Sequence, residues 1–567
     1  MRHHHRHRHA RRHEPLRSVG TARARGLLPR GMRVFCVASE AGASLRRMVP
    51  VSRWASRAAS PCWSAPSRAR SAAHRRWARV GARAAASSDE PWTPPAFEPV
   101  TSAYLHLPFC RRRCYYCDFA VSVVGDNVEG DAVRRGMERY VDQLCREIER
   151  TPLAPSSRRA AASAGAPPPL RTVFFGGGTP SLVPPDLLAR VLAALDHRFG
   201  VHPDAEISME MDPGTFDGDK LDAYVALGVN RVSLGVQSFD ADVLASAGRA
   251  HTVEESRAAI AAVRACPGVR RWSLDLISGL PGLTPKLWRE SLRETVAARP
   301  DHVSVYDLQV EEGTPFARWY TPGEGPLPRE EDAAEMFRDA SRALRAAGYE
   351  HYEVSSYAKP GGRCAHNQVY WNGGEKGWYG FGMAATSRVG DGKGRVARPR
   401  KMREWEALVD AMPEPVDGRE VHADAANGPV DSESADASAF DSAFDSDSAS
   451  ASRAELRAEA LLDRLMLGLR TRDGVDLEAI AREFGRAVPG EILDVLAEQP
   501  AGLAAAYRVE EAGGEETTVA LGEGEARVNA GEEGGGWRVR LTDPEGLMVS
   551  TEVISNLVAR VPSLEAL

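Results

Sequence analysis

Three cysteines occur within eight residues of the 567-residue chain, and their spacing is the strongest chemical signal in the sequence. Cys110, Cys114 and Cys117 form a C-x3-C-x2-C pattern with three arginines between the first two. Three thiolates can bind three irons of a [4Fe–4S] cluster and leave the fourth iron open to a small molecule, and the arginines would stabilise that negative charge. A structural zinc ion is the alternative, but it usually takes four ligands in two pairs, and no second pair follows nearby.

The segment around these cysteines resembles the cluster loop of radical S-adenosylmethionine (SAM) enzymes. Its fuller string, Tyr-x-His-x-Pro-Phe-Cys, is similar to the branch that includes the oxygen-independent coproporphyrinogen III dehydrogenase HemN and its relative HemW. The resemblance, over about residues 100–375, implies that the amino and carboxylate groups of SAM chelate the open iron. It also implies that one electron from the cluster cleaves SAM to methionine and a 5′-deoxyadenosyl radical.

Further polar and glycine-rich motifs follow the cysteines in the same order as in that family. A run of three glycines, Gly176 to Gly178, lets a ligand approach the backbone, although such a run is often only a tight turn. Glu210 is expected at a strand end, where it binds ribose hydroxyls or caps a helix. The resemblance implies SAM contacts at Tyr104, Tyr116, Gly177, Gly178, Thr179, Glu210, Gln237, Arg249 and Asp275.

A histidine-aromatic motif, H-N-x2-Y-W, begins at His366 and resembles the family stretch that faces the porphyrin. An imidazole is a good axial ligand of heme iron, so His366 and Tyr370 are our candidate heme-binding residues. The alternative is a hydrogen-bonded core histidine beside aromatic packing, the usual situation of a single histidine.

One position separates two branches of the family. The coproporphyrinogen dehydrogenase has a further cysteine two residues after its third cluster cysteine, where this chain has Phe119. Phe119 favours the HemW branch, which implies a heme chaperone that binds heme and delivers it to an apo-hemoprotein. Oxidative decarboxylation of coproporphyrinogen III to protoporphyrinogen IX is the alternative, and a cluster-binding scaffold without turnover is a third. Whether the chain is an enzyme is therefore left open.

The partners expected are heme or porphyrin, an apo-hemoprotein recipient and a reductant protein, and a homodimer is one option for the assembly. The sequence gives no indication of nucleic-acid binding, because 72 basic and 78 acidic residues leave a net charge of −6 rather than a uniformly basic chain.

The elements that must position these residues alternate between short apolar strands and amphipathic helices. This alternation predicts an α/β fold with a partial TIM-type (β/α)6 barrel, whose functional residues lie at the carboxyl ends of the strands. The expected strands are residues 103–107, 172–175, 206–211, 229–236, 272–277 and 302–306.

Composition divides the chain further. We expect a radical SAM core at 95–325, an accessory region at 326–411 and a mostly helical C-terminal domain at 454–567. Acidic, Ser- and Gly-rich stretches cannot bury a core, so residues 412–453 are expected to be a disordered linker and residues 510–536 an acidic insertion. The Ala/Pro/Ser-rich residues 152–169 are expected to be a surface insertion.

The first 88 residues carry a net charge of +18, from 20 arginines and two acids, whereas residues 89–567 carry −24. An Arg-, Ala- and Ser-rich start without an apolar core is typical of a disordered transit peptide. We therefore expect import into an organelle, with the chloroplast slightly favoured over the mitochondrion by the Ala-rich end. No apolar run reaches the length of a transmembrane helix, and eight cysteines, mostly scattered, suit a reducing compartment.

Overall fold

The computed structural model describes residues 98–153, 168–372, 376–389, 395–414, 453–509, 516–522 and 536–565. The predicted leader at 1–88 lies outside these residues, as do residues 154–167 of the predicted surface insertion and 415–452 of the predicted linker.

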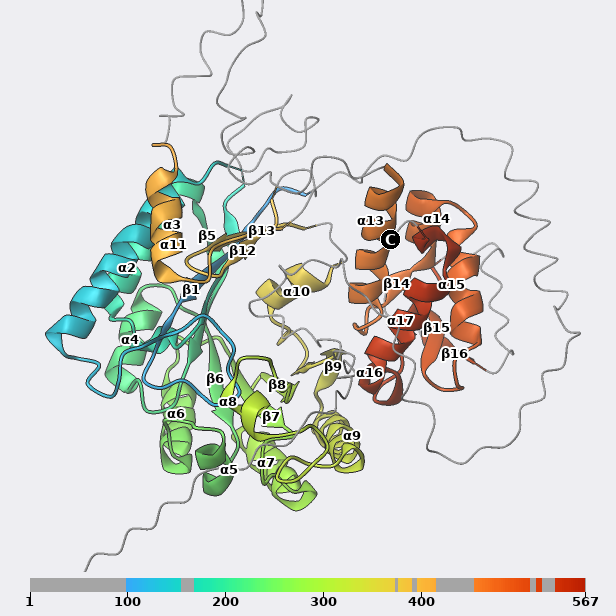
Figure 1. Cartoon of the computed structure of the whole chain (residues 1–567), viewed down its shortest axis with the longest axis horizontal. Helices are drawn as coiled ribbons and strands as arrows, with labels where there is room; N and C mark the ends of the chain where they lie inside the picture. The colour runs from blue at the N-terminus through green and yellow to red at the C-terminus, as the bar shows by residue number, and fades with distance from the viewer. Residues whose placement is uncertain are drawn as a thin grey trace, which may run out of the picture. The chain divides into compact units, whose positions relative to one another are not determined.

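Six parallel strands follow one another in chain order across the centre of a nine-stranded sheet (Figure 1). All six predicted strands are confirmed, and so is the α/β fold with a mostly parallel sheet. Helices connect the strands, as parallel strands require. The strands are β1 (Ser102–Leu107), β4 (Leu170–Gly177), β5 (Val201–Met211), β6 (Arg231–Gln237), β7 (Arg271–Ser278) and β8 (His302–Asp307).

The accessory region adds three strands to the edges of this sheet, which the sequence pattern did not reveal. β11 (Tyr379–Phe381) pairs in parallel with β1, although almost 300 residues separate them in the chain. At the other edge, β10 (Ser356–Ala358) pairs antiparallel with β8, and β9 (Glu350–Glu353) pairs antiparallel with β10. Three or four residues are too few to show the alternation from which strands are predicted.

Helices cover the outer face of the sheet, and α10 (Ala365–Trp371) lies on the opposite, concave side (Figure 1). Each outer helix buries an apolar face against the strands, and two of them begin at threonine caps, Thr252 and Thr284. The outer helices are α2 (Asp131–Arg150), α3 (Pro185–Phe199), α4 (Gly218–Ala226), α5 (Ala241–Ser246), α6 (Val253–Ala265) and α7 (Pro285–Ala298). Beyond β8 follow α8 (Pro315–Trp319) and α9 (Glu330–Ala346).

The concave face of the sheet carries polar side chains. Alternate residues of each strand face opposite sides, so one strand can present apolar residues to the outer helices and polar residues to the concave side. On β5, Ile207 and Met209 belong to the apolar core, whereas Glu206 accepts hydrogen bonds from the backbone of α10 on the other face. On β7, Asp275 accepts a hydrogen bond from Ser233 of β6, 2.7 Å away. The interior of the partial barrel is thus lined by hydrogen-bonding groups rather than by aliphatic side chains.

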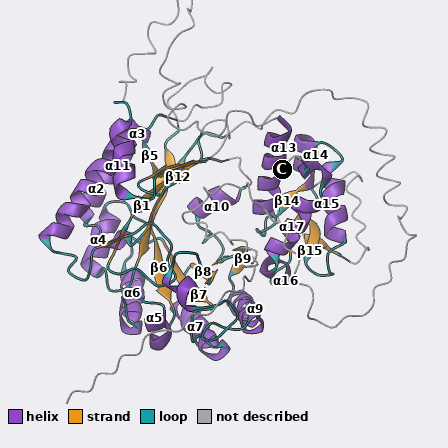
Figure 2. Ribbon diagram, viewed as in Figure 1, coloured by secondary structure: helices purple, strands orange, loops and turns teal. Residues whose placement is uncertain are grey.

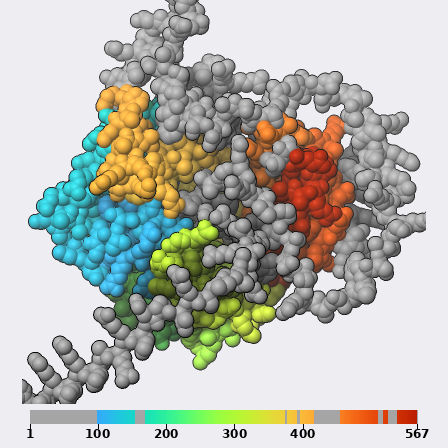
Figure 3. Space-filling model, viewed as in Figure 1, coloured from blue at the N-terminus to red at the C-terminus, as the bar shows by residue number. Residues whose placement is uncertain are grey.

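A buried glutamate on α2 fixes part of the accessory region. Glu147 is fully buried and pairs with the guanidinium of Arg398, with Nε 2.6 Å from Oε1. Its other oxygen accepts hydrogen bonds from the indole of Trp405 and the backbone N–H of Gly382. These bonds hold α11 (Met402–Ala411) beside α2, where the two segments lie against each other on the surface (Figure 3).

The C-terminal part has an apolar core of its own and is helical, as expected, but it also contains a four-stranded sheet (Figure 2). The strand order is β14-β17-β15-β16. A short strand, β14, separates the first two helices of this part, α13 and α14. The elements are α13 (Arg453–Gly468), β14 (Val475–Asp476), α14 (Leu477–Phe484), α15 (Val488–Ala497), β15 (Ala504–Val509), β16 (Glu516–Leu521), β17 (Arg538–Leu541), α16 (Glu545–Met548) and α17 (Ser550–Arg560).

The strand β16 corrects one expectation, because it lies inside the acidic stretch 510–536 that was expected to be unstructured. Its residues pair antiparallel with β15 over six positions. The sequence Glu-Thr-Thr-Val-Ala-Leu has β-branched residues that favour a strand, whereas the glycine- and glutamate-rich flanks dominated the composition. Within the described part of the chain, no helix combines the length and apolar character needed to cross a bilayer.

Candidate functional site

The three cysteines lie on a loop that leaves the carboxyl end of β1 and is fixed at both ends. On the entry side, β2 (Phe109–Cys110) pairs with β3 (Ser122–Val123), which closes the loop as a small ladder. On the return side, His106 Nε2 lies 2.9 Å from the carbonyl oxygen of Ala120. His106 is fully buried, and burial lowers its pKa to about 4, so the ring stays neutral. Its contact with Ala120 holds the end of the loop against β1. The loop is therefore held in place before any ligand binds.

The cysteine thiols are free and close enough to influence one another. Burial raises the pKa of Cys110 to about 12 and that of Cys117 to about 11, and charge on the neighbouring cysteines adds to both shifts. The thiols of Cys110 and Cys117 thus hold their protons until a metal displaces them. Among the described residues, no three cysteine, histidine or acidic side chains converge on one point where a single metal ion could bind. A [4Fe–4S] cluster fits this loop better than one zinc ion, because each cysteine then binds a different iron.

The glycine-rich end of β4 lies directly against the cysteine loop. Thr179 N–H donates to the carbonyl oxygen of Phe109, 2.7 Å away, and its hydroxyl lies 3.6 Å from Cys110 Sγ. A Cβ atom on Gly178 would lie 2.6 Å from the carbonyl carbon of Pro108, and Gly177 has a φ of +111°. The close approach at Gly178 and the positive φ at Gly177 both require glycine, so these glycines do more than form a tight turn.

Two buried carboxyl groups face each other on the concave side. Glu210 Oε2 accepts a hydrogen bond from Gly177 N–H, 3.1 Å away. Burial, together with the charge of Asp275, raises the pKa of Glu210 to about 8. Burial also raises the pKa of Asp275, although three serine hydroxyls, including Ser233 and Ser273, moderate the rise. A pair of desolvated acids on the concave side of the sheet is a typical setting for binding the hydroxyls or the cation of a ligand.

Arg249 joins the cysteine loop to the strand ends. Its Nη1 lies 3.4 Å from Cys114 Sγ and 3.2 Å from the hydroxyl of Tyr116. Its Nη2 donates to Asp212 and to the carbonyl oxygen of Gly235. Tyr116, Arg249 and Cys114 are therefore in mutual contact, as a shared site requires.

Two further candidate residues lie on other strands of the sheet, Tyr104 within β1 and Gln237 at the carboxyl end of β6. The hydroxyl of Tyr104 is 3.3 Å from His106 Nδ1, and its ring stacks on Phe174. Gln237 has a φ of +66°, a conformation that costs energy for a residue other than glycine. Its buried Oε1 accepts no hydrogen bond within the described part of the chain. A strained residue with an unsatisfied acceptor is typical of a ligand-binding position.

His366 and Tyr370 do come together, on α10. Both nitrogens of His366 are engaged, Nδ1 with Thr172 Oγ1 and Nε2 with the hydroxyl of Tyr370, each at 2.8 Å. Burial lowers the pKa of His366 to about 3, and the ring stacks on Phe174. In this arrangement the ring has the contacts of a structural histidine, and neither nitrogen is open to a heme iron.

An exposed aromatic pair marks the solvent side of the cysteine loop. Tyr115, between Cys114 and Cys117, is 37% exposed and meets the ring of Trp319 edge-on at 4.9 Å between centroids. The backbone of Tyr115 is fixed on both sides, because its N–H donates to Ala247 O and its carbonyl oxygen accepts from Phe316 N–H. The loop is therefore anchored while its outer edge stays in contact with water.

The sequence pattern missed three residues that complete the site, Asp212, His251 and His106. Asp212 lies two positions after Glu210 and His251 two positions after Arg249. The signal that could have identified Asp212 was the pair of acids at this spacing, where a strand places both on one face. His106 stands in the quoted motif before the cysteines, but its role depends on a contact with Ala120 that the sequence does not reveal.

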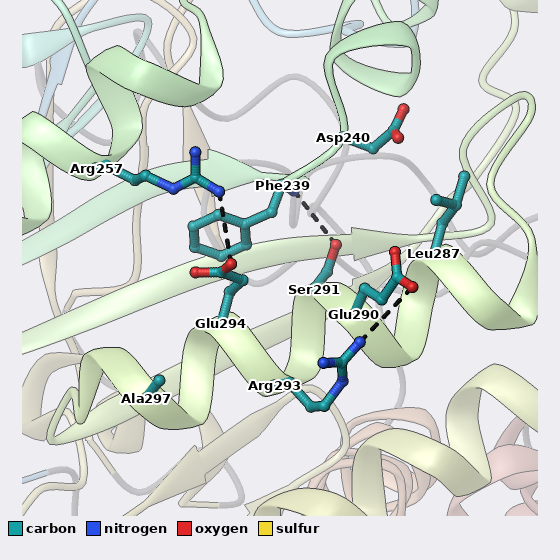
Figure 4. Close-up of a pocket in the computed structure, with 9 residues that line it drawn as sticks. All are labelled: Phe239, Asp240, Arg257, Leu287, Glu290, Ser291, Arg293, Glu294 and Ala297. Carbon is teal, nitrogen blue, oxygen red and sulfur yellow. Dashed lines mark hydrogen bonds and ion pairs between the residues drawn. The ribbon is translucent and has the colours of Figure 1, made fainter.

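A separate groove on the outer surface, between α6 and α7, does not involve these residues (Figure 4). Arg257 and Glu294 face each other across it at 3.5 Å, and Arg293 pairs with Glu290 on α7. These four charged groups are paired, and the fifth, Asp240, caps α5, so the groove offers little to a charged ligand.

Comparison with known proteins identifies two families in the chain. Residues 104–295 match the radical SAM superfamily, and residues 456–495 match the HemN C-terminal domain. The "Heme chaperone HemW" of Synechocystis is 42% identical over 300 residues, which is 53% of this chain and 68% of that protein. The protein of the same name from Escherichia coli is 35% identical, over 54% of this chain and 74% of its own length.

Two further comparisons broaden this result. "Radical S-adenosyl methionine domain-containing protein 1, mitochondrial" of Bos taurus is 34% identical, over 57% of this chain and 69% of its own. The solved structure of the coproporphyrinogen III oxidase HemN from Escherichia coli superposes with a TM-score of 0.55 at 20% identity, covering 81% of this chain and 90% of that one. At that identity the superposition supports the fold alone.

Proposed function

The chain belongs to the HemW family of radical SAM proteins, and from this premise we propose that it is a heme chaperone that delivers heme to an apo-hemoprotein. The observation that carries the proposal is the three-cysteine loop, which is followed by Phe119 instead of a further cysteine and lies beside the strand ends of the radical SAM fold. The identity of up to 42% to proteins named heme chaperones supports it.

We propose the cysteine loop as the site of the cofactors. Cys110, Cys114 and Cys117 would hold the [4Fe–4S] cluster, and the glycine backbone beside Cys110 would face the amino group of SAM. Arg249 would receive the carboxylate of SAM, while Glu210 and Asp275 would receive its ribose and sulfonium side. When bound, the cluster would supply an electron to SAM. The residues of the chain bind, orient and desolvate the ligand.

Heme binding at His366 needs a rearrangement, because both ring nitrogens already have hydrogen-bond partners, Thr172 and Tyr370. Heme ligation at His366 Nε2 requires the hydrogen bond from Tyr370 to open. Titration of the purified, reconstituted chain with heme tests this assignment. His366→Ala should lose the specific binding, and Tyr370→Phe should strengthen it if Nε2 is the ligand atom, or weaken it if the phenol itself binds iron.

His197→Ala is the matched control, because His197 is exposed near the end of α3 and reports only on adventitious heme binding. Equal heme binding by wild type and His366→Ala would show that His366 is not the ligand.

Oxidative decarboxylation of coproporphyrinogen III is the second candidate, and the grouping of the proposed SAM-binding residues around the cysteine loop supports it. Arg249, Glu210 and the glycine run retain positions that a catalytic site would use. An anaerobic incubation with SAM, a reductant and coproporphyrinogen III decides between the two. Formation of protoporphyrinogen would overturn a purely chaperone role, whereas its absence together with heme transfer to an apo-hemoprotein would support the first proposal.

We further propose that the chain works in an organelle and depends on a reductant protein. Three relatives carry "mitochondrial" in their names, which supports an organelle, whereas the preference for the chloroplast gains no support. A fusion of residues 1–97 to a fluorescent protein would show which organelle imports it. Sedimentation of the reconstituted chain would test the homodimer.

A further inference from the structure

A buried carboxylate, Asp212, lies at the centre of the site without a role in any of the assignments above. It follows the last residue of β5, and its side chain is only 16% exposed. Its Oδ1 contacts Arg249 Nη2 and lies 3.2 Å from His251 Nδ1, and its Oδ2 is 4.0 Å from Arg111 Nη2. Three nitrogen-bearing side chains therefore surround one acid.

The side chains that contact Asp212 are themselves held by further hydrogen bonds, so the position of its carboxylate is fixed. His251 is fully buried in its side chain, and its Nε2 lies 3.2 Å from the carbonyl oxygen of Val236 on β6. Arg111 Nη2 donates to the carbonyl oxygen of Pro213. The backbone N–H of Asp212 donates to Ser181 Oγ, 3.2 Å away. Burial alone would raise the pKa of Asp212, but Arg249, His251 and Arg111 hold it below its ordinary value.

Arg249 depends on this acid for its orientation. A guanidinium is planar, so fixing Nη2 also fixes the direction of Nη1 and Nε. Among the described residues, Asp212 is the only carboxylate that hydrogen-bonds to Arg249, and charge-assisted bonds are the stronger ones. With Nη2 held there, Nη1 meets Cys114 and Tyr116, and Nε stays buried without a hydrogen-bond partner among the described residues.

We propose that Asp212 is a positioning residue, which holds the Arg249 guanidinium between Cys114 and Tyr116 in the orientation that receives the carboxylate of SAM. His251 supports it by holding Asp212 against β6. The inference rests on the proposed SAM site, because it assigns to Asp212 an effect that passes through Arg249. In this arrangement the Arg249 guanidinium has two anionic partners on different nitrogens. Asp212 is the permanent partner, and the carboxylate of SAM is the second when the ligand binds.

A double-mutant cycle on SAM binding tests the proposal. The full chain is reconstituted anaerobically, its iron content is measured, and the dissociation constant of SAM is determined by equilibrium dialysis without turnover. Arg249→Ala and Asp212→Asn should each weaken binding about tenfold, and Asp212→Asn should have almost no further effect when Arg249 is already alanine. A merely structural acid would weaken binding by the same factor in both backgrounds.

Two more variants keep the test decisive if Asp212→Asn reduces cluster loading. Asp212→Glu keeps the charge and should recover part of the affinity. His251→Asn leaves the acid in place and should weaken SAM binding by a smaller factor, again only when Arg249 is present. Asp126→Asn is the matched control, because Asp126 is exposed and pairs with Arg112 of the same loop. It should leave SAM affinity unchanged.

The outcomes separate the inference from the proposed function. If Arg249→Ala leaves SAM affinity unchanged, the assignment of Arg249 to SAM is wrong and the inference falls with it. If Arg249→Ala weakens binding but Asp212→Asn and His251→Asn do not, the SAM site stands and the positioning role of Asp212 is overturned. Equal effects of Asp212→Asn in both backgrounds would also overturn it.

Discussion

The thiols and carboxyl groups of the site are adapted to a ligand that the chain alone does not provide. Cys110 and Cys117 keep their protons because they are buried, and Glu210 is largely protonated at neutral pH for the same reason. Each of these groups is costly to ionise until a cation approaches. The iron ions of a cluster, for the thiols, and the sulfonium of a ligand, for the carboxyl groups, are cations of the kind that would offset that cost.

Cys114→Ala should remove the iron–sulfur cluster, because the loop then offers two thiolates instead of three. We expect iron and acid-labile sulfide per chain to fall about tenfold after anaerobic reconstitution. Cys145→Ala is the matched control, since Cys145 lies on α2, away from the cysteine loop in sequence, and also has a raised pKa of about 11. Equal losses in the two variants would show that folding rather than ligation is affected.

Glu210 should make the metal-free chain less stable as the pH rises. Its folded pKa is about 8 and its ordinary value is 4.5, so the folded state binds more protons than the unfolded state between these values. Stability therefore falls from pH 4.5 to pH 8, by about 3–5 kcal/mol from this group. The free energy of unfolding of wild type and Glu210→Gln, measured by denaturant titration at pH 5 and pH 8, should show a steeper fall for wild type. Parallel curves would contradict the raised pKa.

At the scale of elements, the site is assembled by strand ends that touch one another's backbones. The end of β4 contacts the cysteine loop through Gly178 and Thr179, and the end of β5 contributes Glu210 and Asp212. Because parallel strands all end at one edge of the sheet, residues far apart in the chain become neighbours, such as Cys114 and Arg249, which are 135 positions apart. The spacing between elements, more than any one side chain, sets the distance from the cysteines to the carboxylates.

Gly178→Ala should disturb this contact between β4 and the loop. The added Cβ would lie 2.6 Å from the carbonyl carbon of Pro108 and 2.8 Å from the oxygen of Phe109, so backbone must move. We expect destabilisation by about 1–3 kcal/mol and a lower iron content. Gly218→Ala, at the start of α4 in open space, is the control and should leave the melting temperature and iron content nearly unchanged. Similar iron content in both variants would show that the contact is not needed.

The sequence pattern predicted the six central strands and the cysteine loop because both leave strong local signals. Apolar runs marked the strands, and C-x3-C-x2-C marked the ligands. The three edge strands escaped because each is too short for a periodic pattern, and β16 escaped because acidic composition masked it. Asp212 and His106 were missed because their roles arise from contacts with distant residues, Arg249 and Ala120.

At the scale of the whole chain, the described residues contain two separate apolar cores. One lies in the sheet and its outer helices, and the other lies among α13, α14, α15, α17 and the small C-terminal sheet. A core that shares few side chains with another can unfold by itself, and a single unfolding free energy then does not describe the molecule.

Leu496→Ala should therefore destabilise the C-terminal core while the cysteine loop keeps its iron. Leu496 is fully buried on α15, so truncation creates a cavity that costs about 2–5 kcal/mol. Differential scanning calorimetry should show one transition moving to lower temperature, with unchanged iron per chain. Leu274→Ala, equally buried on β7, should move the other transition. A single transition shifted by both variants would mean that the two cores unfold together.

The exposed ring of Tyr115 has a consequence for the environment in which the chain can work. Tyr115 lies between Cys114 and Cys117 and its own backbone is anchored, yet more than a third of its surface is in water. Small oxidants dissolved in that water reach the edge of the loop, where the three cysteines are only partly covered. The more exposed a sulfur atom is, the more readily it is oxidised. We therefore expect the lifetime of an iron–sulfur cluster on this loop to shorten as the oxygen concentration around the protein rises.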